Sequence, residues 1–235
     1  MNKFNRLGII QPGKVGDIII CLPIAKYYFD KGYEIIWPID KNIIHNFVAY
    51  IDYVKFIPID YLHCGIARKV CNEQEWCNTV IDLSFCLPGS WEGRNTTLFQ
   101  ENSLLFDELK YEIAQVPFEE KWNLQYNSSS VDENLLYQVY PQKLFTKDYI
   151  IAHWQGSDYS RKIQLENTNN MPIIEIKPIT KSVFDWINIL TRATALVLID
   201  SCFANLAEQL NLSQKKIFLS RPTPRPTLKH NWTII

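Results

Sequence analysis

The segment Ala195–Ala207, ALVLIDSCFANLA, contains an abrupt change of pattern on which the interpretation of the whole chain rests. An apolar run ends at Asp200, and from Phe203 onward apolar residues recur at the i, i+3, i+4 and i+7 positions of one helix face. A buried strand is therefore predicted to run directly into a helix, with Asp200 or Ser201 as the N-cap. The free amides and the positive dipole end of such a helix attract anions. Joints of this kind also occur in any parallel α/β fold, so the segment alone leaves both interpretations open.

The start of the chain contains a second junction of the same kind. Leu7–Ile10 is predicted as a strand, Gln11–Asp17 as a loop, and Ile18–Phe29 as a helix that ends at Gly32. Ligands of open parallel sheets bind outside the carboxyl ends of the strands. Both junction loops lie at such ends, which makes them the first candidates for a binding site.

Strands and helices alternate along most of the chain. Further strands are predicted at Glu34–Trp37, Val54–Ile57, Thr79–Ser84, Tyr149–Ala152, Ile173–Ile176 and Lys216–Leu219. Helices are predicted at Asn42–Ala49, at Leu104–Val116 and from Ser182, which forms a capping-box pattern with Asp185. This alternation is typical of an α/β fold with parallel sheets and helical crossovers.

The chain is long enough for two small units. We expect an N-terminal Rossmann-like unit at residues 1–145 and a shortened C-terminal one at residues 146–235. The polar, turn-rich segment Asn123–Tyr140 is expected to link the two halves. Two open-sheet units joined in this way are expected to face a cleft.

Composition limits the possible classes of function. Of the 235 residues, 47% are apolar and 13% are aromatic, which is enough for a sizeable core. The net charge of -1 gives no overall attraction to nucleic acid or to anionic membranes. The first residues contain no long apolar signal core, and no apolar run approaches the length of a membrane span. We therefore expect a soluble, cytoplasmic protein whose six cysteines are reduced.

Several cysteines and one histidine lie close together in the sequence, namely His63, Cys64, Cys71, Cys77 and Cys86. Zinc sites usually contain pairs of cysteines separated by two to four residues. This cluster contains no such pair. Buried or half-buried thiols are therefore favoured over a zinc site, and no metal is expected.

Four segments carry a resemblance to a known family. Gly16-Asp17 is followed by aliphatic residues, Pro23 and Ala25, and Thr79–Leu83 reads TVIDL. Ser157–Lys162 is a polar loop ending in lysine, and Ile179–Ala207 contains a helix, a strand and the Asp-Ser-Cys junction. Together these segments resemble the ADP-heptose:lipopolysaccharide heptosyltransferases, which form glycosyltransferase family 9 and have the GT-B fold.

The resemblance implies a fold of two Rossmann-like units facing a cleft. It implies a nucleotide-sugar donor in the C-terminal half and an acceptor in the N-terminal half. It also implies inversion at the sugar carbon without a required metal. No cofactor is then needed, because the nucleotide sugar is a co-substrate.

Sugar transfer needs a base for the acceptor hydroxyl and a cationic or amide-rich pocket for the leaving diphosphate. Asp17, at a loop-to-helix junction, is the candidate base, and Gly13, Lys14 and Gly16 form the candidate acceptor loop. The alternative role of Asp17 is that of a helix cap.

The candidates for donor and phosphate binding are Ser160, Arg161, Lys162, Asp200, Ser201, Cys202 and Asn205. Lys162, with Arg161, would hold phosphate as a cation, or would be ordinary solvated charge. The amides of Ser201 and Cys202 would contact the diphosphate, while Asp200 shapes the turn. Asn205 would reach the donor or would make a simple surface or cap hydrogen bond. His153 and Trp154 are further candidates for the nucleotide pocket, although Trp154 equally suits the core.

The chain departs from the family pattern at several points. Cys202 replaces a glycine and Asn205 a histidine of the family motif, and a side chain at position 202 obstructs the closest approach to phosphate. A strand and a helix that the family has between Lys162 and Ile173 are missing, and the chain stops soon after Arg221–Thr227. We therefore expect a reduced donor half, for which neither heptose nor ADP is implied.

The favoured function is an inverting glycosyltransferase that acts on a lipopolysaccharide or another surface glycan, with homo-oligomerisation left open. One alternative is a phage-type enzyme that glycosylates modified DNA bases, which requires a basic stripe of Lys110, Arg221, Arg225 and Lys229. Another is a non-catalytic binding protein derived from such an enzyme. The sequence contains neither the G-x-G-x-x-G nor the G-x-x-x-x-G-K-[ST] motif, which argues against a dinucleotide-dependent epimerase or a P-loop kinase.

Overall fold

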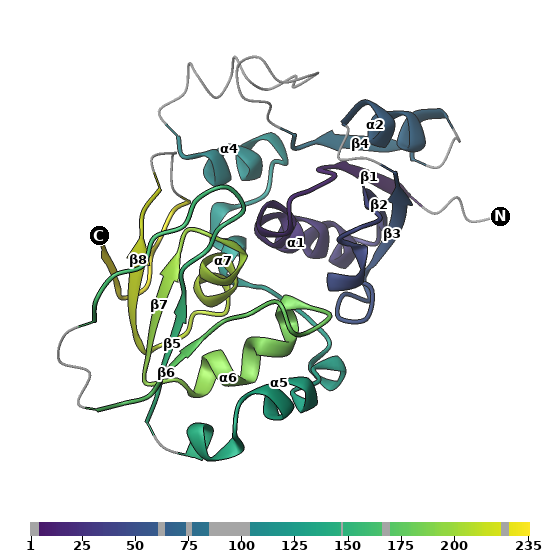
Figure 1. Cartoon of the computed structure of the whole chain (residues 1–235). Helices are drawn as coiled ribbons and strands as arrows, with labels where there is room; N and C mark the ends of the chain where they lie inside the picture. Colours follow the sequence, from purple (N-terminus) through teal and green to yellow (C-terminus); the bar gives the residue numbers. More distant parts are fainter. Residues whose placement is uncertain are drawn as a thin grey trace. The chain divides into compact units, whose positions relative to one another are not determined.

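The computed structural model describes residues 5–60, 64–73, 77–84, 104–146, 148–165, 170–221 and 226–235. The chain divides into two compact units, Met1–Asn127 (unit 1) and Ser128–Ile235 (unit 2). Figure 1 labels their α-helices and the strands β1–β8. Each unit has one parallel sheet with helices, which confirms the predicted α/β class. Within the described residues, no helix has both the length and the apolar composition that a membrane crossing requires.

Unit 1 contains a four-stranded parallel sheet in the order β3-β2-β1-β4. Its strands are β1 (Arg6–Ile10), β2 (Glu34–Asp40), β3 (Val54–Ile59) and β4 (Thr79–Asp82). Its helices are α1 (Val15–Asp30), α2 (Cys64–Glu73) and α4 (Phe106–Ile113), with the 3-10 helices η1 (Ile44–Asn46) and η2 (Phe118–Trp122). In the parallel register Gly8 of β1 lies between Ile36 of β2 and Val80 of β4. β1 is therefore a central strand.

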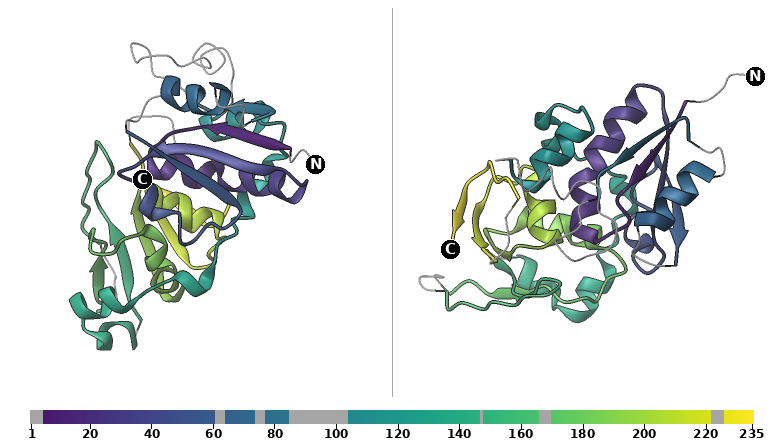
Figure 2. Two further views of the ribbon diagram at one scale, coloured as in Figure 1. Left: turned by 90° about the vertical axis from the view of Figure 1, so that its right-hand side faces the viewer. Right: turned by 90° about the horizontal axis from the view of Figure 1, so that it is seen from above.

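Helices α1 and α2 cover opposite faces of the unit 1 sheet (Figure 2, left). Side chains alternate along a strand, and Ile10 of β1 packs with Ala67 and Cys71 of α2. Gly8 points to the same face as Ile10, because the two are two residues apart. The chain leaves α1 through Gly32, whose φ of 87° lies in the left-handed region that glycine tolerates. The sequence-based end of this helix is thereby confirmed.

Unit 2 contains a five-stranded parallel sheet in the order β6-β5-β7-β8-β9. Its strands are β5 (Ile150–His153), β6 (Ile173–Glu175), β7 (Ala195–Ile199), β8 (Lys215–Leu219) and β9 (Trp232–Ile234). Its helices are α5 (Asn134–Val139), α6 (Ile187–Arg192) and α7 (Cys202–Gln209). The 3-10 helices are η3 (Ser128–Ser130), η4 (Gln142–Thr146) and η5 (Val183–Trp186).

The two faces of the unit 2 sheet are covered differently. On one face, Phe203 of α7 contacts Trp186 of η5, with ring centroids 6.2 Å apart. On the other face the buried strand residues pack against side chains of the β5–β6 connection, namely Trp154, Tyr159, Ile163, Leu165 and Met171. The described part of this connection, residues 154–165 and 170–172, is irregular. Within the described residues, irregular chain thus covers this face of the sheet.

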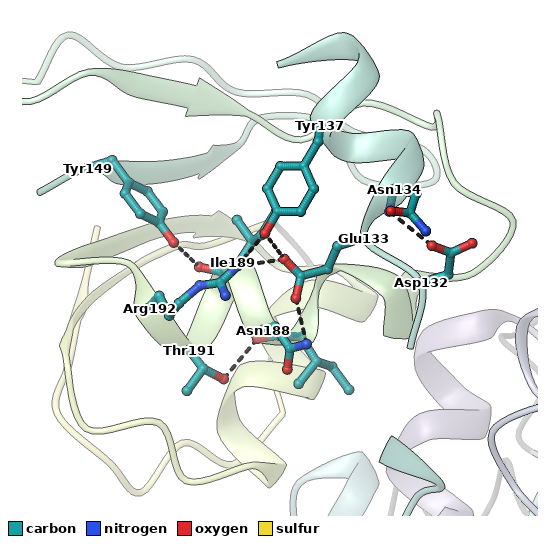
Figure 3. Close-up of polar contacts among 10 residues, drawn as sticks. Asp132, Glu133, Asn134, Tyr137, Tyr149, Asn188, Ile189, Thr191 and Arg192 are labelled. Atoms are coloured by element: carbon teal, nitrogen blue, oxygen red, sulfur yellow. Dashed lines mark hydrogen bonds and ion pairs between the residues drawn. The ribbon is translucent and has the colours of Figure 1, made fainter. Parts of the chain in front are cut away.

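A polar network fastens α5 to α6 (Figure 3). The carboxylate of Glu133 accepts hydrogen bonds from the Tyr137 hydroxyl, from Asn188 Nδ2 at 2.6 Å and from Arg192 Nη2 at 2.6 Å. Burial opposes the ionisation of Glu133, but these hydrogen bonds hold its pKa below the ordinary value. Residues 128–145 therefore belong to unit 2, whereas the expected boundary between residues 145 and 146 assigns them to the N-terminal unit.

Most predicted elements are present, but some differ. The sequence predicts a helix at Asn42–Ala49, and the structure has only the short 3-10 helix η1 there. The Asp40 side chain accepts a hydrogen bond from the backbone amide of Asn42 at 2.9 Å, which favours a turn over an α-helix. The predicted link Asn123–Tyr140 contains α5. Sequence patterns missed the ten-residue helix α2 and β9, which has three residues.

Candidate functional site

Polar residues of unit 2 gather where its strands end. β5 ends at His153, β6 ends at Glu175, and β7 is followed directly by Asp200 and Ser201. Because these strands are parallel and adjacent, their carboxyl ends lie along one edge of the sheet. We call this edge, together with Arg221 after β8, the unit 2 edge. It is the place where an open α/β sheet binds ligands.

Ser201 is the N-cap of α7, but its side chain does not cap the helix. Its Oγ atom instead lies 3.0 Å from Nδ1 of His153. The His153 ring packs edge-on against Phe203, with centroids 4.8 Å apart. Burial lowers the pKa of His153 to about 4, so the imidazole is neutral at pH 7. The start of α7 is thus tied to β5 through a neutral histidine.

Cys202 occupies the first turn of α7, where the family motif has glycine. Burial raises the pKa of its thiol to about 12, although the sulfur also accepts hydrogen bonds from the backbone amides of Phe203 and of Cys202 itself. The thiol is therefore un-ionised and lies against the amides that would bind an anion at a helix start. Asn205, one turn further on, is buried, with 5% of its surface exposed. An anion at this turn has to share or displace the contacts of the sulfur.

Lys162 lies at the unit 2 edge as part of a three-residue cluster. Its Nζ pairs with Oε1 of Glu175, and the same oxygen accepts a hydrogen bond from Trp154 Nε1 at 3.1 Å. The Lys162 Nζ atom also lies 5.8 Å from the centroid of the Trp154 ring. The hydrogen bond from Lys162 lowers the pKa of Glu175. Because the Lys162 side chain is 66% exposed, its cation is held in place yet accessible to a ligand.

Arg221 joins two loops of the unit 2 edge. Its Nε donates to Oδ2 of the buried Asp200 at 3.0 Å, and its Nη1 donates to Oδ1 of the exposed Asp158 at 2.8 Å. The loop also approaches the β7–α7 turn at Gly156, where an added Cβ would lie 3.3 Å from the Asp200 carbonyl oxygen. Arg221 therefore holds the loop that leads to Lys162 against the turn that leads to α7.

Ser160 and Arg161 lie between Asp158 and Lys162. Ser160 is exposed and forms an isolated antiparallel bridge with Gln155. The Arg161 amide donates to the Trp154 carbonyl at 2.9 Å, and its Nη1 donates to the backbone oxygen of Ile235 at 3.0 Å. Arg161 thus binds within unit 2, whereas Lys162 is the more exposed of the two predicted phosphate ligands.

Asp17 lies in the first turn of α1, at the carboxyl edge of the unit 1 sheet. It is half-buried, and its Oδ2 accepts a hydrogen bond from the Lys14 amide at 3.3 Å. This contact is the helix-capping role that the sequence left open as an alternative. In the candidate acceptor loop, Gly13 is buried, Lys14 is exposed and Gly16 is half-buried.

The buried side chain of Lys110 is connected to the candidate acceptor loop through hydrogen bonds. Lys110 of α4, with 2% of its surface exposed, donates from Nζ to Gln11 Oε1 at 2.6 Å and to the Leu83 carbonyl at 2.7 Å. Gln11 in turn donates from Nε2 to the Gly13 carbonyl at 2.5 Å. The side chain of Lys110 thus fixes the loop that precedes Asp17.

Burial of Lys110 also corrects the basic stripe considered for DNA binding. A buried ammonium group with protein acceptors cannot contact DNA phosphates, so the predicted set of four cations is wrong at this position. Arg221 is paired with two aspartates, and Lys229 is exposed. Arg225 lies outside the described residues.

The cysteine cluster consists of free thiols where it is described. Cys71 is buried, and Cys64 and Cys77 are half-buried. His63 and Cys86 lie outside the described residues. Among the side chains that are described, no three His, Cys, Asp or Glu residues form a group that could hold a metal ion.

Sequence reasoning missed Glu175 and Asp158, and it considered Arg221 only for DNA binding. Glu175 and Arg221 belong to no motif, and Asp158 lies in the Ser157–Lys162 segment but was not singled out there. The available signal was their position, because Glu175 is the last residue of a strand and Arg221 follows closely after one. Polar residues at the carboxyl ends of parallel strands are candidates even without a motif.

The chain resembles solved glycosyltransferase structures along nearly its whole length. It matches E. coli heptosyltransferase WaaC with ADP-2-deoxy-2-fluoro heptose at 13% identity and a TM-score of 0.55, covering 98% of this chain and 92% of that one. It matches the glycosyl transferase family 9 structure from Veillonella parvula at 12% identity and a TM-score of 0.57, covering 99% and 86%. The iron-containing dodecameric glycosyltransferase TibC from enterotoxigenic E. coli matches at 10% identity and 0.58, covering 100% and 63%.

No protein-family model and no curated protein sequence matches the chain. These three structural matches are below 25% identity, so they establish the fold alone. They agree with the motifs at Asp17, Lys162 and Asp200 that resemble the same family. The chain therefore has the α/β fold of the heptosyltransferase-like glycosyltransferases of family 9, with a small second unit.

Proposed function

We propose that the chain is an inverting glycosyltransferase that moves a sugar from a nucleotide-sugar donor to a hydroxyl acceptor. The observation that carries this proposal is the unit 2 edge, where the start of α7, the exposed cation of Lys162 and the guanidinium of Arg221 belong to neighbouring strand ends. Amides and cations at such an edge suit the diphosphate of a nucleotide sugar. The fold supports the same function, since the E. coli WaaC structure has this fold and contains an ADP-sugar analogue.

On the donor side, each residue has a separate role. Lys162 binds diphosphate oxygens and exchanges its contact with Glu175 for the ligand. The amides of Ser201 and Cys202 bind the same group from the start of α7, while Asp200 fixes the turn through Arg221. The negative charge that develops on the leaving diphosphate is thereby stabilised by groups that are already in place. The proposal includes no metal and no other cofactor.

On the acceptor side, Asp17 is the general base. The acceptor hydroxyl attacks the anomeric carbon from the side opposite the leaving diphosphate, so that one C–O bond forms as the other breaks. The hydroxyl proton passes to the carboxylate of Asp17, and the nucleoside diphosphate leaves with the bonding electrons. A positioned base of this kind contributes about 10²–10⁴-fold to rate. The hydrogen bond from the Lys14 amide orients the carboxylate.

The acceptor proposed is a lipopolysaccharide core or another surface glycan. It rests on the resemblance of the motifs, and burial of Lys110 removes one cation from the DNA-modifying alternative. A non-catalytic binding protein is a second candidate, and Cys202 favours it. Its sulfur lies against the first-turn amides of α7 and thus competes with a diphosphate.

The test combines binding and turnover on the full chain. UDP, ADP, GDP and CMP are titrated calorimetrically, and sugar nucleotides of the preferred base are then assayed for transfer to glycan acceptors. The variant Asp17→Asn is expected to bind the nucleotide like the wild type but to form product about 10²–10⁴-fold more slowly. If no nucleotide binds at millimolar concentration, the proposal is wrong. Nucleotide binding without turnover in the wild-type chain supports the binding protein instead.

A further inference from the structure

Two cysteine side chains share the space above one glycine of the unit 1 sheet. Cys71 lies in α2, and Cys77 lies just before β4. An added Cβ on Gly8 would lie 2.8 Å from the Cys71 sulfur and 2.9 Å from the Cys77 sulfur. The two thiols also form a hydrogen bond with each other. Both sulfurs therefore lie over the same backbone position, and the missing side chain of Gly8 on β1 makes room for both.

The two thiols differ in exposure and in ease of ionisation. Cys71 is fully buried, whereas Cys77 is half-buried and accessible from solvent. The hydrogen bond from Cys71 lowers the pKa of Cys77 and outweighs the opposing effect of burial. The cation of Arg6 lowers it further, while Glu34, which pairs with Arg6, raises it. The same hydrogen bond, together with burial, raises the pKa of Cys71. Since the thiolate is the reactive form of cysteine, Cys77 is the nucleophile of the pair and Cys71 its buried neighbour.

We propose that Cys77 and Cys71 form a reversible thiol–disulfide pair that reacts with small-molecule disulfides such as glutathione disulfide. The Cys77 thiolate attacks one sulfur of the small disulfide, and a mixed disulfide forms as one small thiolate leaves. The Cys71 sulfur, after giving up its proton, attacks the Cys77 sulfur and releases the second thiolate. Two protein thiols are thereby oxidised, and one small disulfide is reduced to two thiols.

The position of the pair separates it from the proposed sugar-transfer site. Cys77 precedes β4, whereas the unit 1 residues assigned to transfer lie at the carboxyl ends of the strands. A Cys71–Cys77 disulfide would link α2 covalently to the segment just before β4. It would thereby restrict movement of the helix that covers this face of the sheet. The inference does not rest on the proposed function.

The test uses the full chain in mixtures of reduced and oxidised glutathione, followed by acid quenching and alkylation. A protease that cuts after glutamate is needed, because Glu73 and Glu75 lie between the two cysteines while no lysine or arginine does. We expect a Cys71–Cys77 linked peptide with the loss of two hydrogens, which dithiothreitol reverses. In the reduced protein we expect Cys77 to be alkylated about tenfold faster than Cys64.

Three variants distinguish this pair from random oxidation. Cys71→Ala should keep glutathione attached to Cys77, because the resolving sulfur is absent. Cys77→Ala should form neither the adduct nor the link, and the control Cys64→Ala should behave like the wild type. Circular dichroism confirms that each variant is folded. The proposal is overturned if Cys64, Cys71 and Cys77 are alkylated equally at every glutathione ratio in the wild type. It is also overturned if Cys71→Ala still releases glutathione from Cys77 by forming an intramolecular disulfide with another cysteine.

Discussion

The Nδ1 atom of His153 lies 3.0 Å from the Oγ atom of Ser201, so the N-cap serine of α7 bonds to β5 instead of to its own helix. A serine at this position usually accepts a hydrogen bond from an amide of the first turn. Because the Ser201 oxygen faces His153, its side chain makes no hydrogen bond to the first-turn amides of α7. The relationship links the end of one strand to the start of the helix that follows the neighbouring strand.

The burial of His153 predicts a specific dependence of stability on pH. The pKa of His153 falls from an ordinary 6.5 to about 4 in the folded chain. Between these values the unfolded chain binds a proton at His153 that the folded chain does not bind. The contribution of neutral His153 to the free energy of unfolding is therefore fully present above pH 6.5 and is lost as the pH falls toward 4. The full effect is about 3 kcal/mol, since each pKa unit corresponds to about 1.4 kcal/mol.

The measurement compares urea unfolding of the wild type and of His153→Asn from pH 7.5 to pH 4. The variant cannot titrate at this position, so its stability should fall less steeply than that of the wild type in this range. Proton NMR of the wild-type imidazole should give a midpoint near 4. A midpoint near 6.5 would show that the ring is solvated and would remove the argument.

Replacement of Lys162 by alanine should weaken nucleotide-diphosphate binding about 10-fold or more, because a charge-assisted hydrogen bond to phosphate contributes about 1.5–3 kcal/mol. Stability should change by less than about 1 kcal/mol, since the Lys162–Glu175 pair is solvent-exposed. Lys215→Ala is a matched control, because Lys215 is an exposed lysine at the opposite, amino end of a strand in the same sheet. Equal affinities for the two variants would exclude Lys162 as a phosphate ligand.

Replacement of Arg221 by alanine should increase local opening of the loop at residues 155–162, which contains Lys162. Arg221→Ala loses the contacts to both Asp200 and Asp158, whereas Asp158→Asn weakens only one of them. Backbone hydrogen exchange at residues 155–162 should therefore rise in both variants, and more in Arg221→Ala. Exchange in β5 and β7 should stay unchanged, which distinguishes a local effect from unfolding. Unchanged exchange in the loop of both variants would show that Arg221 does not hold it.

The sequence was sufficient to predict the junctions of this fold, because they are local. The change from a buried run to helical spacing after Asp200 predicts β7 and α7, and the same pattern predicts β1 and α1. The helix α2 was not predictable in this way. Ala67 and Cys71 of this helix pack with Ile10 and Ile59 of the sheet, contacts between segments that lie far apart in the sequence.

The sequence predicted some residues of the candidate site but not the ion pairs that they form. Lys162 was singled out from its motif, yet its partner Glu175 lies 13 residues further along the chain, at the end of β6. Arg221 and Asp158 are separated by 63 residues. Such pairs are set by the order β6-β5-β7-β8, which no local pattern contains. Strand order therefore had to be known before the clusters could be recognised.

The buried ion pair of Lys121 and Asp107 should be far more sensitive to mutation than an exposed ion pair of unit 1. The two side chains are fully buried, with Nζ 2.6 Å from Oδ2. Lys121→Met leaves the buried aspartate without this cation, which should cost about 3–5 kcal/mol. The exposed pair of Lys41 and Asp60 has the similar distance of 2.7 Å, and Lys41→Met should cost less than about 1 kcal/mol.

Urea unfolding followed by tryptophan fluorescence measures both changes. The double variant Lys121→Met/Asp107→Leu should recover much of the loss, because replacement of both charges removes the desolvation penalty along with the attraction. If Lys121→Met costs no more than Lys41→Met, water reaches the pair and unit 1 is open at this point. Burial, and not the length of the ion pair, is therefore the quantity that this comparison tests.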